Sequence, residues 1–195
     1  MVRRKHPQPK EIRAHLMDSA LRAFAARGYE STTIRHIAEE AKVAAGLLYH
    51  YFPSKQAVLM ALFERSAGLV MAAFAEVATI ADPREKLTQL LRESARLVRE
   101  NREFWQVSYG VRFQHSVLAG LAHDVAAQSA VYVQLFTLLL SDLGRPRPEL
   151  EARLLFATLD GVFQHYVLDP ETYPLDALLE RVIDNLTLPT EKEIP

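Results

Sequence analysis

The sequence contains no cysteine and only seven glycines among its 195 residues. Without cysteine the chain forms neither disulfides nor thiolate metal sites. A long hydrophobic run is also missing: the best membrane candidate, residues 67–81, is interrupted by Glu76 and is shorter than the roughly 20 residues that a span needs. No signal-peptide pattern opens the chain. We therefore expect a soluble, cytoplasmic protein.

Side chains that would support catalysis or bind a metal are scarce as well. His115 and His123 have only Asp124 nearby, and no helical pair of histidine and glutamate ligands occurs. Asp160 and His165 suggest acid–base chemistry, but no nucleophile or phosphate-cradling loop accompanies them. We therefore predict no catalytic site, no metal site and no cofactor, and we expect that the protein is not an enzyme.

Charge is distributed unevenly along the chain. Residues 1–55 hold ten Lys/Arg against five Asp/Glu, a balance of +5, whereas residues 56–195 hold thirteen against nineteen, a balance of −6; the two sum to −1. Basic segments favour polyphosphate partners, because each neutralised phosphate releases a counterion. A basic tail that only keeps the protein soluble fits the charge equally well. Charge alone therefore leaves nucleic-acid binding open.

Apolar residues recur at spacings of three and four along most of the chain, which is typical of amphipathic helices. Expected helices span residues 10–27, 33–41, 45–52, 55–80, 83–100, 102–113, 117–143, 149–168 and 175–186. Gly28 is expected to close the first of them as a left-handed cap. No strand pattern, repeat or low-complexity segment interrupts the series. The sequence therefore predicts an all-α fold of about nine helices.

Residues 32–59 form the most informative segment. They read as two short helices joined by a tight turn, with a third helix starting directly after Pro53. The second helix has Tyr49, His50 and Tyr51 where a buried helix would have aliphatic side chains. A small unit with such an exposed face suits insertion into a DNA groove. The alternative is that these aromatic side chains are packed in a core, the more common role of a single tyrosine.

The order and spacing of these residues resemble the DNA-reading segment of the TetR family of bacterial transcription regulators. The matching residues are Thr32, Thr33, Ile37, Ala38, Gly46, Tyr49, Tyr51, Phe52, Ser54 and Lys55. The resemblance covers about residues 10–65 and implies a helix-turn-helix at residues 33–52. It further implies a basic arm at residues 1–9, a DNA-binding domain at 10–54, a helical effector-binding and dimerisation domain at 55–187, and a flexible tail at 188–195.

Two residues of the turn depart from the family pattern. Lys42 stands where glycine is usual, and Ala44 stands where serine is usual. Because an L-residue adopts the left-handed conformation only with strain, we expect either a different turn or a strained one. The missing serine removes a helix cap worth about 1 kcal/mol.

The segment also yields a set of predicted DNA contacts. Thr33, at a helix start, offers a hydroxyl and backbone N–H groups to phosphate. Gly46 allows close approach to base edges, and His50 can donate to a base acceptor. The full predicted set is Thr33, Ala45, Gly46, Leu47, Tyr49, His50, Tyr51 and Lys55. In this set the tyrosines and Lys55 contact phosphates, and Ala45 and Leu47 contact apolar base groups.

One recognition helix reads too few bases to be selective, so we expect a homodimer on palindromic double-stranded DNA. TetR-like proteins dimerise through their last two long helices. The candidate interface here consists of Leu154, Ala157, Thr158, Gly161, Leu179, Val182, Ile183 and Leu186. The alternative is that this stripe faces only the core of its own protomer.

The resemblance also implies a small-molecule effector bound between helices of the larger domain. Aromatic candidates for its pocket are Phe74, Trp105, Tyr109, Phe113, Tyr132, Phe136, Phe163, His165 and Tyr166. Each of them is also a good core residue. Their apolar character indicates a hydrophobic or aromatic effector.

We therefore predict a ligand-responsive transcriptional regulator, a repressor that a small effector releases from its operator. An architectural or interaction protein that binds DNA without sensing an effector is the main alternative. A helical enzyme with an accidental resemblance is the weaker one.

Overall fold

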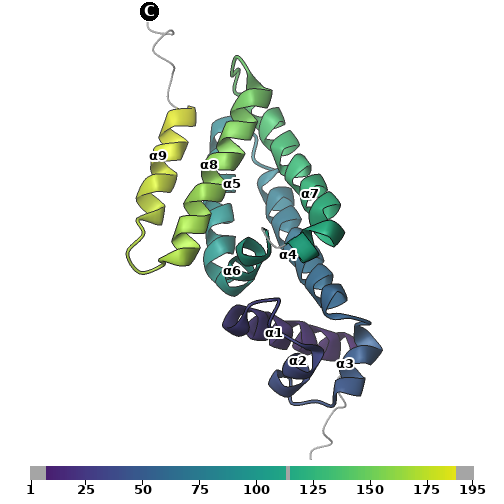
Figure 1. The fold of residues 1–195 in the computed structure, drawn as a ribbon. Helices are drawn as coiled ribbons and strands as arrows, with labels where there is room; N and C mark the ends of the chain where they lie inside the picture. The colour runs from purple at the N-terminus through teal and green to yellow at the C-terminus, as the bar shows by residue number, and fades with distance from the viewer. Residues whose placement is uncertain (1–7, 113–114, 188–195) are drawn as a thin grey trace, which may run out of the picture.

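The structure is a computed structural model that describes residues 8–112 and 115–187. This part of the chain contains nine α-helices and no strand (Figure 1). The helices are α1 (Pro9–Arg27), α2 (Ile34–Glu40), α3 (Ala45–Tyr51), α4 (Lys55–Val77), α5 (Pro83–Glu100), α6 (Arg102–Val111), α7 (His115–Asp142), α8 (Pro148–Leu168) and α9 (Leu175–Thr187). The all-α prediction is confirmed, and the helix ends differ from the expected ones by a few residues.

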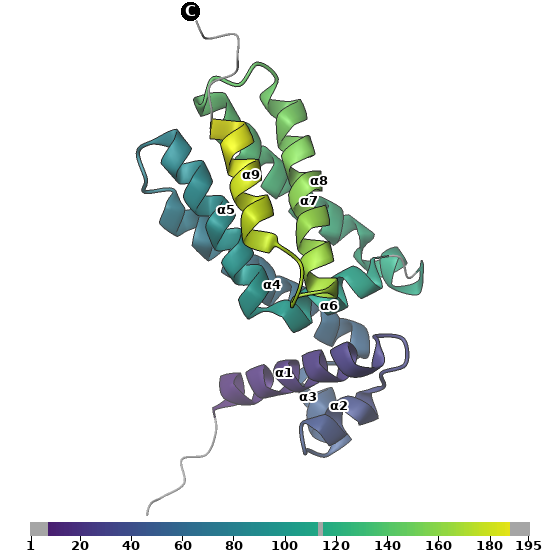
Figure 2. The same ribbon diagram turned by 90° about the vertical axis from the view of Figure 1, so that its left-hand side faces the viewer.

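The helices form a small head and a larger body. Helices α1, α2 and α3 lie together at one end of the molecule, and α4 runs from them into the body (Figures 1 and 2). Helices α5, α7, α8 and α9 make up the rest of the body, and α6 lies where the body meets α1. Helices α2 and α3 therefore lie at the end of the described chain that is opposite the body (Figures 1 and 2).

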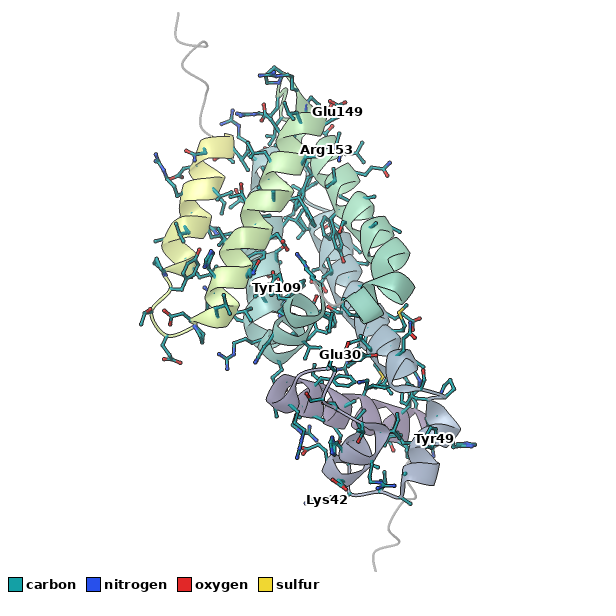
Figure 3. The ribbon with its side chains drawn as sticks, viewed as in Figure 1. Glu30, Lys42, Tyr49, Tyr109, Glu149 and Arg153 are labelled. Carbon is teal, nitrogen blue, oxygen red and sulfur yellow. The ribbon has the colours of Figure 1, made fainter. Side chains whose placement is uncertain are left out.

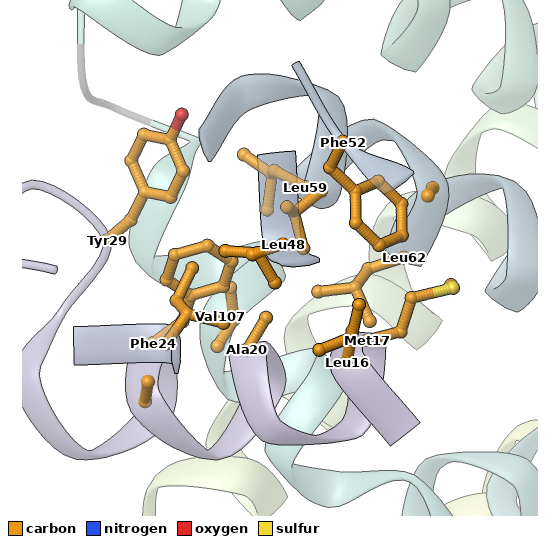
Figure 4. Packing of buried hydrophobic residues seen from close by; sticks show 14 of the residues in the cluster. Leu16, Met17, Ala20, Phe24, Tyr29, Leu48, Phe52, Leu59, Leu62 and Val107 are labelled. Carbon is orange, nitrogen blue, oxygen red and sulfur yellow. The ribbon is translucent and has the colours of Figure 1, made fainter. Parts of the chain in front are cut away.

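A continuous apolar core holds the head together. Leu16, Ala20 and Phe24 recur on one face of α1 and pack against Leu48 of α3 and against Phe52 (Figure 4). Phe52, which directly follows α3, is likewise buried in this core. Burying side chains of this size contributes about 1.5–3 kcal/mol each.

The head core does not end with α3. The first half of α4 contributes Val58, Leu59 and Leu62, and α6 contributes Phe104 and Val107 to the same cluster. Val107 is drawn among the head residues in Figure 4. Helix α6 is therefore anchored in the head although it follows α5 in the body.

A second cluster forms the core of the body. It joins Leu87 and Leu91 of α5 to Leu140 of α7 and to Leu155 and Leu159 of α8. Leu87 and Leu91 are four residues apart, as are Leu155 and Leu159, so each pair lies on a single face of its helix. The body is therefore a bundle with its own core.

Ion pairs hold α9 on the surface of this bundle. Arg92 donates from Nε and Nη2 to the two carboxylate oxygens of Glu180, both at 3.0 Å. One turn earlier in α9, Asp176 accepts from Arg99. Both arginines lie on α5, so these pairs fix the register between α5 and α9.

Helix α4 is the one described helix that is long and apolar enough, by length and composition, to cross a membrane. The expectation that no segment has this character is thus wrong for residues 55–77. The physical reason is local: α4 packs against α1, α5 and α7 and supplies part of a cavity wall. Packing inside the protein accounts for part of its apolar composition, because 28% of the apolar window is buried.

Candidate DNA interface and ligand cavity

The helix-turn-helix begins with two threonines that have different roles. The Thr32 hydroxyl donates to the Gly28 carbonyl at 2.7 Å and so ties the segment to the end of α1. Thr33 is the N-cap of α2, where its hydroxyl accepts from the His36 amide at 3.2 Å. The Thr33 amide meanwhile lies 3.3 Å from the His36 ring Nδ1. The amide expected to be free for phosphate is therefore part of a capping box.

The turn between α2 and α3 is strained at the residue that departs from the family pattern. Lys42 has a φ of 56°, the only positive φ of a non-glycine residue in the described ranges. The turn keeps its shape through a hydrogen bond from the Val43 amide to the Ala38 carbonyl, 2.9 Å long. Of the two expected outcomes, the strained turn is the one observed. Ala44, as expected, caps α3 without a side-chain hydrogen bond.

Helix α3 buries one face and exposes the other. Leu48 is fully buried in the head core, whereas Gly46 and His50 are exposed and Tyr49 exposes 56% of its surface. Figure 3 shows Lys42 and Tyr49 on the outer surface of the head. Ala45, Leu47 and Tyr51 are half-buried. The predicted recognition face is therefore open to a partner.

Lys55 lies in a different environment from the one expected beside phosphate. Its Nζ donates to the Tyr29 carbonyl at 2.7 Å and to the Glu30 carbonyl at 3.1 Å, and it lies 4.3 Å from the centre of the Tyr29 ring. Partial burial lowers the pKa of Lys55, and the nearby Glu30 carboxylate opposes this shift. Two of its three N–H groups are thus used to hold the loop between α1 and α2.

A second cation lies on the open side of the head. A shallow hollow between α2 and α3 is lined by Thr33, Ile34, Arg35, His36, Ala45 and Tyr49. Arg35 is exposed there and was not among the predicted contacts. Its position next to the N-cap of α2 is the signal that identifies it, because phosphate contacts gather at helix N-termini.

The body contains a cavity with a volume of about 140 Å³. Six of the nine predicted pocket residues line it, namely Phe74, Trp105, Tyr109, Tyr132, Phe136 and Phe163. The rings of Phe74, Tyr132 and Phe156 form a stack with centroids 6.2 and 6.3 Å apart. The cavity is therefore mostly aromatic and aliphatic, as a pocket for an apolar molecule would be.

Two predicted pocket residues lie elsewhere. His165 is exposed on α8 and stacks on Tyr173 with centroids 5.9 Å apart, and Tyr166 packs against the body core. Both follow Phe163 on α8, where the helical turn carries them to other faces. Phe113 lies outside the described residues, as do the side chains of His115 and His123.

The polar residues of the cavity were not predicted as pocket residues. Ser108 of α6, Arg112 directly after α6 and Asp160 of α8 line it beside Tyr109. Arg112 Nη1 donates to Asp160 Oδ2 at 2.5 Å, and the guanidinium carbon lies 4.7 Å from the centre of the Tyr109 ring. Desolvation raises the pKa of Tyr109, and the Asp160 carboxylate adds to the shift. Trp105, Tyr109 and Arg112 are separated by four and three residues. This helical spacing was the sequence signal that could have identified Arg112 as a pocket residue.

The predicted dimerisation stripe is divided by the fold. Leu179 and Ile183 expose only 3% and 5% of their surface, because they pack into the body core against α5. For these two residues the expectation of a free face is wrong. Leu154 exposes 67%, and Ala157 is also exposed. The remaining candidates, Thr158, Gly161, Val182 and Leu186, are half-buried.

An exposed two-helix reading unit joined to a helical body with an internal cavity defines a regulator of the helix-turn-helix class. Family comparisons agree with this class. The description "Bacterial regulatory proteins, tetR family" matches residues 16–62, and "BetI-type transcriptional repressor, C-terminal" matches residues 83–187. The chain therefore belongs to the TetR family of transcriptional regulators.

Individual relatives extend this similarity over the whole chain. The HTH-type transcriptional regulator TtgR of Pseudomonas putida is 31% identical over 94% of this chain and 93% of its own length. The fatty acid metabolism regulator protein of Bacillus subtilis is 25% identical over 93% of this chain and 96% of its own length. The match to the B. subtilis regulator YuxN is 43% identical but covers only 27% of this chain and 18% of that protein.

Solved structures share the fold. The fatty acid degradation regulator FadR from Bacillus halodurans superposes with a TM-score of 0.80 at 23% identity, covering 96% of this chain and 99% of that one. FadR from B. subtilis, solved in complex with stearoyl-CoA, gives 0.75 at 21% identity, covering 90% and 96%. The similarity of these structures thus agrees with the helical fold described above.

Proposed function

We propose that this protein is a homodimeric repressor that binds a palindromic operator and is released by a small hydrophobic or aromatic effector. The observation that carries the proposal is the position of α6, which contributes to two sites at once. Phe104 and Val107 of α6 are buried in the head core, and Phe104 also lines the cavity together with Trp105 and Tyr109 of the same helix. A ligand that shifts α6 would therefore move the head.

DNA binding is assigned to the exposed face of α3 and the N-terminus of α2. The contacting residues that we propose are Thr33, Arg35, Ala45, Gly46, Leu47, Tyr49, His50 and Tyr51. A Cβ atom at Gly46 would meet no protein atom within 4 Å, so packing within the protein does not require glycine there. Close approach of a base edge would require it.

Dimerisation is assigned to the exposed side of α8 and its border with α9. Leu154 is a large apolar side chain left open to water, and a Cβ atom at Gly161 would meet no atom within 4 Å in the protomer. A helix of a second protomer would cover Leu154. It could also pack closely against Gly161, because small residues permit close helix approach. Ala157, Thr158, Val182 and Leu186 complete the proposed surface.

The effector is assigned to the cavity. Its aromatic and aliphatic walls favour an apolar molecule, and the relative crystallised with stearoyl-CoA makes an acyl chain one candidate for the body of that molecule. DNA binding and effector release also imply that the protein acts in the bacterial cytoplasm.

Selection from a random duplex library tests the proposal. We expect recovery of a site with two-fold symmetry, and binding that weakens as salt rises, since phosphate contacts release counterions. Compounds that change the fluorescence of Trp105, the single tryptophan, are then added to the complex. At least one of them should lower operator affinity. An affinity that no cavity ligand changes would instead favour an architectural DNA-binding protein.

A further inference from the structure

The cavity has a polar end whose chemistry selects among apolar ligands. Its elements are the Arg112–Asp160 ion pair and the hydroxyl of Ser108, which lies on α6 one helical turn before its C-cap residue Arg112. All other walls near this end are apolar or aromatic, apart from hydroxyl groups of serine and tyrosine. The residues of the polar end therefore determine which functional group of a ligand the cavity can bind.

Ser108 is the most informative residue of this end. It exposes only 4% of its surface and lines the cavity, yet its hydroxyl has no hydrogen-bond partner within the described part of the chain. By contrast, the Ser94 hydroxyl, also in the wall, donates to the Leu90 carbonyl at 2.8 Å. A buried polar group without a partner is costly, so an orphan hydroxyl on a cavity wall indicates that a ligand supplies the partner.

Arg112 offers further hydrogen-bond donors for the same ligand. Its Nη1 is used by Asp160, whereas its Nε and Nη2 bond to no residue in the ranges that the structure describes. A guanidinium carries five N–H donors and no acceptor. Together with the Ser108 hydroxyl, the free N–H groups of Arg112 can donate to an acceptor oxygen of a ligand.

The charge at this end is already balanced. Arg112 and Asp160 are paired at 2.5 Å with side chains that are 31% and 26% exposed. A ligand carboxylate placed here would add an unpaired negative charge beside Asp160 in a partly dry site, which is unfavourable. A neutral carbonyl accepts the same hydrogen bonds without that cost.

We propose that the cavity selects uncharged apolar molecules that carry one carbonyl group, with Ser108 and Arg112 donating to the carbonyl oxygen and Asp160 excluding anions. Esters, thioesters, amides and ketones share this chemistry. The inference rests on the proposed function, since it names the class of effector for that cavity. Asp160 and Arg112 are specificity-determining residues in this scheme.

A charge-matched ligand series tests the proposal on the full-length protein. Methyl octanoate, octanoate and octylammonium have similar apolar bodies and no absorbance that interferes with Trp105 fluorescence. We expect the parent to bind methyl octanoate at least about tenfold more tightly than either ion. In Asp160→Asn, which leaves Arg112 unpaired, octanoate should become the preferred ligand. In Arg112→Gln, which leaves Asp160 unpaired, octylammonium should become preferred.

Two serine variants isolate the hydrogen bond. Ser108→Ala should weaken methyl octanoate binding about two- to tenfold. Ser19→Ala is the matched control, because Ser19 is a buried serine of α1 outside the cavity whose hydroxyl already donates to the His15 carbonyl, and it should leave the affinity unchanged. Thermal melts of all variants show whether each is folded before its affinity is compared.

Three results would overturn the proposal: a parent that prefers octanoate, an Asp160→Asn variant with unchanged preference, or no binding of any compound in the series. None of these results touches the proposed function, which is judged by operator selection and by release with any cavity ligand. Failure of operator binding, in turn, leaves the measured ligand preference standing. The two claims therefore fail separately.

Discussion

Val107 and Ser108 are consecutive residues of α6 that belong to different parts of the molecule. Val107 is buried in the core of the head, and Ser108 lines the cavity of the body. Because neighbouring residues on a helix are about 100° apart, one short helix presents a face to each site. Any rotation of α6 caused by a ligand must therefore repack the head core.

Val107→Ala tests this coupling. Removing two methyl groups from the head core should lower the free energy of unfolding by about 1–3 kcal/mol and loosen the grip of the head on α6. We expect effector affinity, read from Trp105 fluorescence, to stay within about twofold, while the effector's influence on operator affinity weakens. Val167→Ala, which removes the same groups from a buried position of α8, should lose stability but keep the coupling. Equal coupling in both variants would argue against transmission through α6.

Lys42 carries strain that glycine would relieve. A left-handed conformation costs an L-residue about 1–2 kcal/mol. Glycine removes this cost, but part of the stability gained is offset by the flexibility of glycine in the unfolded chain. Lys42→Gly should therefore raise the free energy of unfolding by about 0.5–1 kcal/mol in urea denaturation. Lys42→Ala removes the same charge and keeps the positive φ, so it should give no gain. A Lys42→Ala variant as stable as Lys42→Gly would show that strain is not the cause.

Gly46 is expected to matter for DNA and not for folding. Gly46→Ala should leave stability unchanged or raise it by up to about 1 kcal/mol, because alanine favours a helix and has open space there. It should weaken operator binding at least about tenfold by blocking close approach. Gly68→Ala, on α4 with similarly open space, is the control and should leave operator affinity as in the parent. Equal operator binding by both variants would remove Gly46 from the interface.

Lys55 is expected to act within the head. Lys55→Met keeps most of the apolar stem and removes the two hydrogen bonds to the carbonyls of Tyr29 and Glu30. We expect a loss of about 1–3 kcal/mol in unfolding free energy, since hydrogen bonds from a charged group are lost. The dependence of operator affinity on salt should keep the parent slope. A slope lower by about one would instead place the third N–H group on a phosphate.

Leu154 is the most exposed of the proposed dimer residues, so a charge there should separate the protomers. Leu154→Glu is expected to raise the dimer dissociation constant at least about tenfold, measured by analytical ultracentrifugation, because a buried carboxylate would be left unpaired. Operator affinity should fall with it. Leu138→Glu places the same charge at a 58% exposed leucine of α7 and is expected to leave the dimer intact. Dissociation by Leu138→Glu alone would move the interface to α7.

The sequence by itself determined the helical class, the approximate extent of each helix and the exposed face of α3. These features depend on local patterns: apolar spacing, the caps at Thr33 and Asp82, and the order of residues from Thr32 to Lys55. Such signals act over a few residues, so they can be read along the chain. The strain at Lys42 also followed from one residue type at one place in a turn.

Only the tertiary structure decided which of several similar faces meet. The fold buries Leu179 and Ile183 under α5 and turns Lys55 toward the loop after α1. It also brings Arg112, directly after α6, to Asp160 of α8, 48 residues away in the chain. Helical spacing shows that residues share a face, but it does not show what lies opposite. The relative rotation of packed helices sets that, and it arises from the summed fit of many side chains.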